Sequence, residues 1–178
     1  DTAVSVSSQG VGILSDQFLP DADWSNWSAG PVRTANEVYA TGQTFNFQLG
    51  TENGGVQISD HRAAPGWVGS AGDAAFRVEL EFELESGDTS GAGILVDWRN
   101  SLSELSRSYL PLAEMLSEPV VIGRKMLASA IVHRPASFAG TFARNTIYLM
   151  ANYSSLGATT AKGIKFHRFQ IYPITVTD

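Results

Sequence analysis

The chain has 178 residues, a formal net charge of -6 at pH 7 and no cysteine. Its length fits one domain, and the lack of cysteine excludes disulfide bridges and thiolate metal sites. Because Lys and Arg form no cluster, the composition argues against binding to nucleic acid. No apolar run reaches the ~18 residues of a membrane-spanning helix, so we expect no membrane insertion.

The N-terminal segment alternates valines with small polar residues. Residues 1–10 contain Val4 and Val6 in this pattern, which predicts a linker or an edge strand. Residues 11–178 are then expected to form a single domain that opens with a short strand near Val11.

An acidic loop with two tryptophans follows. Asp16, Asp21 and Asp23 offer hard oxygen ligands, which makes them candidates for a structural calcium, although their spacing is not that of an EF-hand. Trp24 and Trp27 either pack over the edge of the core or stack on a sugar.

Three short strand candidates come next, and a Gly- and Pro-rich loop over residues 61–73 follows them. Within this loop, Trp67 is flanked by residues too small to bury it locally. We interpret Trp67 as a candidate for ligand stacking; the alternative is packing against the edge of a sheet.

The stretch from Ala75 to Asn100 predicts two strands joined by a turn. Large apolar residues alternate with charged ones, so one face of the strands is expected to be buried and the other charged. We expect the two strands to pair directly. The predicted core residues are Phe76, Val78, Leu80, Ile94, Val96 and Trp98, and the predicted charged surface consists of Arg77, Glu79, Asp97 and Arg99.

A ladder of carboxylates, Glu79, Glu81 and Glu83, lies on one face of the first of these strands. Alternate residues are roughly 6 to 7 Å apart along a strand, near the ~5 to 5.5 Å between the carboxyl groups of retaining glycosidases. The ladder resembles the catalytic strand of laminarinase-like jelly-roll glycosidases, with Glu81 replacing their central Asp. The alternatives are a small glycoside hydrolase using Glu79 and Glu83, or a solvated strand face neutralised by basic residues.

Residues 101–117 predict a short helical insertion. Ser101 and Glu104 have the spacing of a capping box, and Pro111 is expected to start a second helical turn. Further strands are expected between Val120 and Ile171, with a β-bulge near His167 and Arg168 where the apolar alternation changes parity.

About ten short strands and one minor helical insertion predict an all-β fold. Charged residues make up 17% of the chain, and its 17 glycines suit many turns. We therefore expect a two-sheet antiparallel β-sandwich of the jelly-roll type.

Three stretches together resemble the β-sandwich carbohydrate-binding modules, in particular those in tail fibres and spikes of phages and gene transfer agents. They are Val11 to Trp27, the block from Ile58 to Asn100 with its Pro-Gly-Trp loop, and the closing strand from Gly163 to Pro173. Members with a structural calcium commonly have an Asp in the last strand, where this chain has His167 and Arg168.

The resemblance implies a non-catalytic glycan-binding domain, extracellular or on a particle surface, that recognises a host receptor. Its partners would be a polysaccharide or cell-surface glycan and other fibre subunits. No cofactor is expected apart from the candidate calcium, and a structural or oligomerising fibre module is the alternative function. We expect the ligand to contact Trp67, Arg77, Glu79, Asp97, Arg99 and Tyr109.

Overall fold

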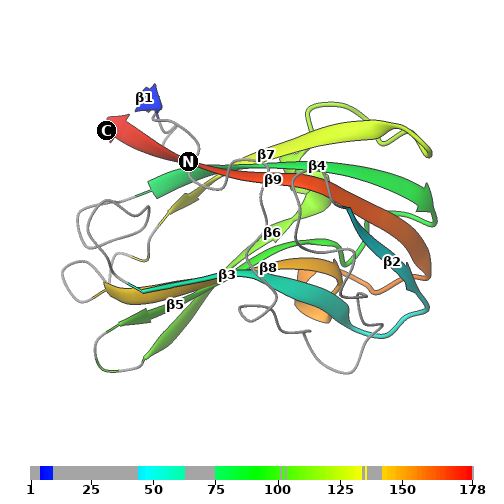
Figure 1. Cartoon of the computed structure of the whole chain (residues 1–178), viewed down its shortest axis with the longest axis horizontal. Coiled ribbons are helices and arrows are strands. Elements are labelled where there is room, and N and C mark those ends of the chain that lie inside the picture. Colours follow the sequence, from blue (N-terminus) through cyan, green and yellow to red (C-terminus); the bar gives the residue numbers. More distant parts are fainter. Residues whose placement is uncertain are drawn as a thin grey trace.

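The computed structural model describes residues 5–9, 44–62, 75–100, 102, 104–133, 135 and 142–177. These residues form two antiparallel sheets packed face to face (Figure 1), which confirms the predicted β-sandwich. The first sheet contains β1 (Ser5–Gln9), β2 (Phe45–Leu49), β4 (Ala75–Ser86), β7 (Lys125–His133) and β9 (Lys162–Thr177). The second sheet contains β3 (Gly54–Arg62), β5 (Gly93–Asn100), β6 (Leu105–Pro111) and β8 (Phe142–Asn152).

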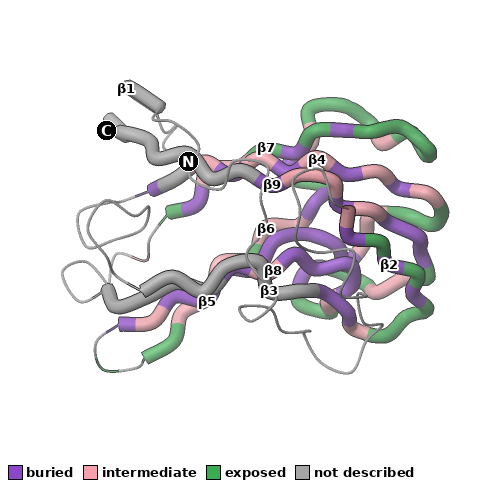
Figure 2. Tube along the Cα trace, in the orientation of Figure 1, coloured by how far each residue is buried: buried purple, intermediate pink, exposed green. Residues whose placement is uncertain are grey.

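The core lies between the sheets and is built from alternate residues of the strands. Every second residue of β4 from Val78 to Leu84 is at most 2% exposed. The described core phenylalanines lie on the first sheet, and both sheets contribute branched aliphatic residues. Figure 2 shows these buried positions alternating with partly exposed ones along β4. On β5, Ile94, Val96 and Trp98 are fully buried in the same core. The predicted inward faces of β4 and β5 are therefore correct for the side chains that the structure describes.

The predicted pairing of β4 with β5 is wrong. Strand β4 pairs with β7 and β9, whereas β5 pairs with β6 and β8, so the two strands lie in opposite sheets. The connecting segment 87–92 crosses from one sheet to the other. At roughly 3.5 Å per residue, it is long enough to span the ~10 Å between packed sheets. An apolar alternation specifies which face is buried, and it is equally compatible with strands that face each other across the core.

The predicted helical insertion is also largely wrong, because residues 105–111 form the strand β6. The side-chain oxygen of Asn100 accepts hydrogen bonds from the backbone N–H groups of Leu102 (3.0 Å) and Glu104 (2.9 Å). These bonds close a turn between β5 and β6 in place of the expected helix cap. The helical part is limited to the 3-10 helix η3 (Leu112–Met115), which follows Pro111. Ser101 lies outside the described residues.

The predicted bulge is present in β9. Glu81 of β4 is opposite Arg168, but the next residue, Phe82, is opposite Phe166, so His167 is the extra residue. The bulge reverses the parity of the strand and lets both Phe166 and Phe169 enter the core, at 0% and 2% exposure.

Strand β1 pairs with the C-terminal part of β9. No helix in the described part of the chain is long and apolar enough to cross a membrane. The predictions for Asp16, Asp21, Asp23, Trp24, Trp27 and Trp67 fall outside the described residues.

Candidate functional site

The candidate site lies on the outer face of the second sheet, where β5 and β6 pair. Asp97 is directly opposite Arg107, and Leu95 is opposite Tyr109. Residues directly opposite in an antiparallel pair have their side chains on the same face. Because Val96 and Trp98 point into the core, Asp97, Arg107 and Tyr109 share the outer face. Together with Tyr153, which follows β8, we name these residues the β6 face.

Two tyrosines form the aromatic part of the β6 face. The rings of Tyr109 and Tyr153 are stacked, with centroids 6.4 Å apart and planes inclined by 21°. Tyr109 is 43% exposed. Tyr153 is partly buried and packs against a small apolar cluster of Leu95, Met150 and Leu156, which is separate from the main core. This packing restrains Tyr153, and through the stacked rings also Tyr109, while part of the aromatic surface faces solvent.

A charged pair adjoins the tyrosines. Arg107 Nε donates a hydrogen bond to Asp97 Oδ1 at 3.0 Å, and the two side chains are 31% and 8% exposed. Partial burial by itself lowers the pKa of Arg107. The Asp97 carboxylate and a hydrogen bond to Tyr109 outweigh this effect, so the pKa of Arg107 lies above its ordinary value. Tyr153 joins this group through its stacked contact with Tyr109. The four side chains of the β6 face therefore form one linked cluster.

A hydrogen bond on the inner face of β5 also stabilises the pairing of β5 with β6. Trp98 is fully buried, and its indole N–H donates a hydrogen bond to Ser108 Oγ of β6 at 2.9 Å. Trp98 is thus a core residue, as its parity predicts. Because it joins β5 to β6 from the inner side, it stabilises the register that pairs Asp97 with Arg107.

The structure brings together only some of the residues predicted to bind ligand. Asp97 and Tyr109 belong to the β6 face, and Arg99 lies farther along β5, opposite Leu105. Arg77 and Glu79 are on β4, in the other sheet. The single charged surface predicted for Arg77, Glu79, Asp97 and Arg99 is therefore wrong, because the core of the sandwich separates β4 from β5.

The carboxylates of β4 are paired with basic side chains on the outer face of the first sheet. The Glu79 carboxylate interacts with Arg77 of its own strand and, at 4.0 Å, with Arg168 of β9. The next three pairs are Glu81–Lys125 (3.9 Å), Glu83–His167 (3.3 Å) and Glu85–Lys165 (2.8 Å). This arrangement favours a solvated, charge-neutralised strand face over a pair of catalytic carboxylates.

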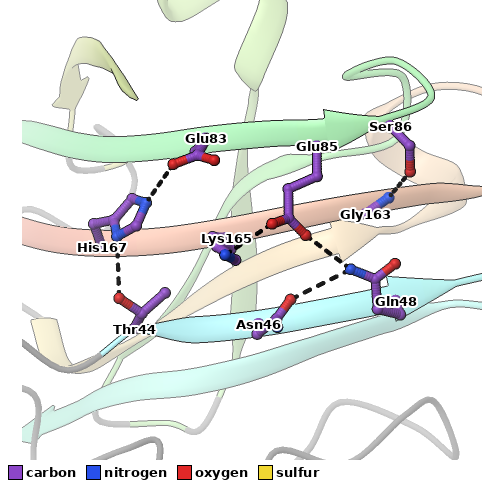
Figure 3. A network of polar contacts seen from close by, with 9 residues as sticks. All are labelled: Thr44, Asn46, Gln48, Glu83, Glu85, Ser86, Gly163, Lys165 and His167. Atoms are coloured by element: carbon purple, nitrogen blue, oxygen red, sulfur yellow. Dashed lines mark hydrogen bonds and ion pairs between the residues drawn. The ribbon is translucent and has the colours of Figure 1, made fainter. Parts of the chain in front are cut away.

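Figure 3 shows how this polar network extends across three strands. Glu85 of β4 lies between Lys165 of β9 and Gln48 of β2, whose amide donates to its carboxylate at 2.9 Å. The hydrogen bond from Lys165, and then its charge, lower the pKa of Glu85 despite a smaller opposing effect of burial. The network joins β2, β4 and β9, and no Phe, Tyr or Trp is among the residues drawn in Figure 3.

Sequence reasoning missed Arg107 and Tyr153. In the Leu-Ser-Arg-Ser-Tyr stretch from Leu105 to Tyr109, small serines alternate with large residues, which is the period of a strand. That signal was sufficient to place Arg107 and Tyr109 on one face. No comparable signal exists for Tyr153, because its position beside Tyr109 depends on the pairing of β8 with β5.

No group of three or more His, Asp or Glu side chains suited to a metal ion occurs within the described ranges. The calcium candidates Asp16, Asp21 and Asp23 lie outside these ranges, so the calcium stays a prediction.

No protein-family model matches the chain, and no curated protein matches it significantly. Several solved structures match, and two of them are similar over nearly the whole chain. The CBM22-1 xylan-binding domain of Paenibacillus barcinonensis Xyn10C has a TM-score of 0.52 and 12% identity, covering 97% of each chain. The xylan-binding module CBM15 has a TM-score of 0.51 and 14% identity, covering 92% of this chain and 97% of its own. At these identities the likeness shows the fold alone, which is the two-sheet β-sandwich that this chain shares with both modules.

Proposed function

We propose that this domain is a non-catalytic glycan-binding module and that the sugar binds to the β6 face. The observation that carries the proposal is the partly exposed pair of Tyr109 and Tyr153 beside the Arg107–Asp97 ion pair. Sugars offer apolar C–H faces that pack on aromatic rings, and hydroxyl groups that accept and donate hydrogen bonds. A guanidinium group is a fixed fork of donors that suits neighbouring hydroxyls.

The fold supports a polysaccharide as the ligand, since the two similar structures described above are named as xylan-binding modules. Isothermal titration with xylan, mixed-linkage glucan and bacterial surface polysaccharides tests the proposal. We expect binding to at least one of them, and we expect the Tyr153→Ala variant to lose it. A folded protein that binds none of these polymers would overturn the proposal.

We further propose that the module belongs to a virus-like fibre or spike and recognises a polysaccharide on the host surface. The support is the resemblance carried by Val11 to Trp27, Ile58 to Asn100 and Gly163 to Pro173. We expect the protein to bind bacterial surface polysaccharide more tightly than xylan. A preference for xylan would contradict the proposed role in a virus-like fibre. Whether the domain associates with further copies of itself, as a fibre subunit would, is tested separately by measuring its mass in solution.

We also keep the proposal that Asp16, Asp21 and Asp23 bind a structural calcium. Melting curves recorded with excess calcium and with a chelator test it on the whole chain. A higher melting temperature in calcium is expected, because an ion that binds only the folded state stabilises that state. Identical curves would remove the calcium from the proposal.

A further inference from the structure

A buried ammonium group lies where β9 begins. Lys162 is only 3% exposed, and its Nζ donates hydrogen bonds to the backbone oxygen of Ser90, at 2.6 Å, and to Asn152 Oδ1. Asn152 is fully buried, and its amide nitrogen donates to the backbone oxygens of Gly50 and Thr160, each at 3.0 Å. These two side chains therefore join the end of β8 and the start of β9 to the distant segments at Gly50 and Ser90.

The bonds of Lys162 lie beside the backbone hydrogen bond that the Tyr153 N–H makes. Asn152 directly precedes Tyr153 in the chain. The Tyr153 N–H donates to the backbone oxygen of Gly91 at 2.8 Å, and Gly91 follows Ser90, whose oxygen Lys162 binds. Gly91 has a φ of +76°, and a Cβ there would lie 3.3 Å from Asn152 Oδ1. The turn that receives the Tyr153 amide is thus packed closely against Asn152.

Stability alone is a poor reason for a charged group at this position, because a buried charge loses its hydration. This burial lowers the pKa of Lys162 to about 8, against the opposing influence of the Asp88 carboxylate. Asp88 is held in the same turn, where it accepts hydrogen bonds from Ser90 N–H (3.0 Å) and from the Thr160 hydroxyl (2.7 Å). What the buried ammonium group provides is a cross-link between the turn at Ser90 and the side chain of Asn152.

We propose that Lys162 is a positioning residue of the glycan site: its ammonium group locks the turn at Ser90 and Gly91 against Asn152 and so fixes Tyr153 beside Tyr109. The effect on glycan affinity rests on the proposed function. The effect on the order of Tyr153 does not require a glycan and is measured without one.

The first measurement is hydrogen exchange of single amides by NMR in wild type and Lys162→Met. The amide of Tyr153 reports the bond to Gly91, and the amide of Phe82, in the middle of β4, reports the opposite sheet. We expect protection at Tyr153 to fall by about tenfold or more, the equivalent of one hydrogen bond, and to fall further than at Phe82. Equal losses at both amides, or no loss at Tyr153, would overturn the proposal.

The matched control is Lys165→Met, which removes the same charge three residues along the same strand but from the outer face of the first sheet, where Lys165 pairs with Glu85. We expect it to leave protection at Tyr153 unchanged. If Lys162→Met does not fold, Asp88→Ala provides the test, because this exposed residue shapes the same turn. A loss of protection at Tyr153 in that variant supports the proposal, and its absence contradicts it.

The second measurement is glycan affinity at a temperature at which every variant is fully folded. We expect Lys162→Met to bind about tenfold more weakly than wild type and Lys165→Met to bind equally well. If wild type binds no glycan while Tyr153 loses protection in Lys162→Met, the proposed function fails and the positioning role stands. If wild type binds glycan and Lys162→Met binds it equally well, Lys162 does not position the site.

Discussion

Asp97 and Arg107 face each other across β5 and β6, and their hydrogen-bonded ion pair is 3.0 Å long although only 8% of the Asp97 side chain is exposed. The sequence predicted Asp97 as a charge displayed to solvent for ligand binding. Its burial gives it a different role, which is to orient the more exposed guanidinium of Arg107. We therefore expect the ligand to contact Arg107 and not Asp97 directly.

The first prediction separates the two members of this pair. Arg107→Met leaves the buried carboxylate of Asp97 without the guanidinium, so we expect it to lower the free energy of unfolding by about 3 kcal/mol. Asp97→Asn is expected to cost less, because water reaches the 31% exposed side chain of Arg107. Urea unfolding of both variants measures the difference. A larger loss in Asp97→Asn than in Arg107→Met would contradict this assignment.

The second prediction concerns the aromatic pair. Tyr109→Ala removes a ring that is 43% exposed, so we expect a small change in stability and a loss of about 2 kcal/mol in glycan binding, which is roughly thirtyfold in Kd. Titration calorimetry measures the affinity. Leu127→Ala is the control, since Leu127 is 53% exposed but belongs to the first sheet. Equal losses of affinity in the two variants would argue against a site on the β6 face.

The third prediction tests the core assignment of Trp98. Because this side chain is fully buried, Trp98→Ala should lower the free energy of unfolding by roughly 3 to 5 kcal/mol. Trp98→Phe fills most of the volume but removes the hydrogen bond to Ser108, so its cost should be smaller. Thermal melting compares the three proteins. If Trp98→Ala left the melting temperature unchanged and abolished glycan binding, our assignment of the inner and outer faces of β5 would be reversed.

The fourth prediction is a pH dependence of stability. The pKa of Lys162 is about 8 in the folded protein and 10.5 as its ordinary value. Between these values the unfolded chain binds more protons than the folded chain, so the contribution of Lys162 to the free energy of unfolding rises with pH over this window. The gain is of order 3 kcal/mol at most.

Urea unfolding of wild type and Lys162→Met, repeated from neutral pH to above the ordinary pKa of lysine, isolates this contribution. The difference between the two proteins should shift in favour of wild type as the pH increases. A difference that is constant across the window would show that the Lys162 ammonium is not buried in solution.

The fifth prediction addresses the carboxylate ladder. Glu79 lies in the first sheet beside Arg77 and Arg168, so we expect Glu79→Gln to leave glycan affinity unchanged. Incubation of wild type with oligosaccharides, followed by analysis of the products, tests the hydrolase alternative in parallel. Turnover by wild type that disappears in Glu79→Gln would establish the catalytic role that the pairing with basic residues disfavours.

The sequence by itself determined the β-sandwich class and the buried face of its central strands. The alternation from Val78 to Leu84 has a period of two, and a strand with that pattern excludes water only by turning one face inward. The change of parity between Phe166 and Phe169 likewise predicted the bulge at His167, since two apolar residues of opposite parity reach one core only if an extra residue lies between them.

The tertiary structure alone decided which strands are neighbours, and with that the composition of the candidate site. Backbone hydrogen bonds between strands are nearly independent of side-chain identity, so the alternation on β4 and β5 left their pairing open. The crossing of segment 87–92 separated Arg77 and Glu79 from Asp97. The pairing of β5 with both β6 and β8 placed Arg107 beside Asp97 and Tyr153 beside Tyr109. The contact between Tyr109 and Tyr153 joins residues distant in sequence, and no local pattern specifies it.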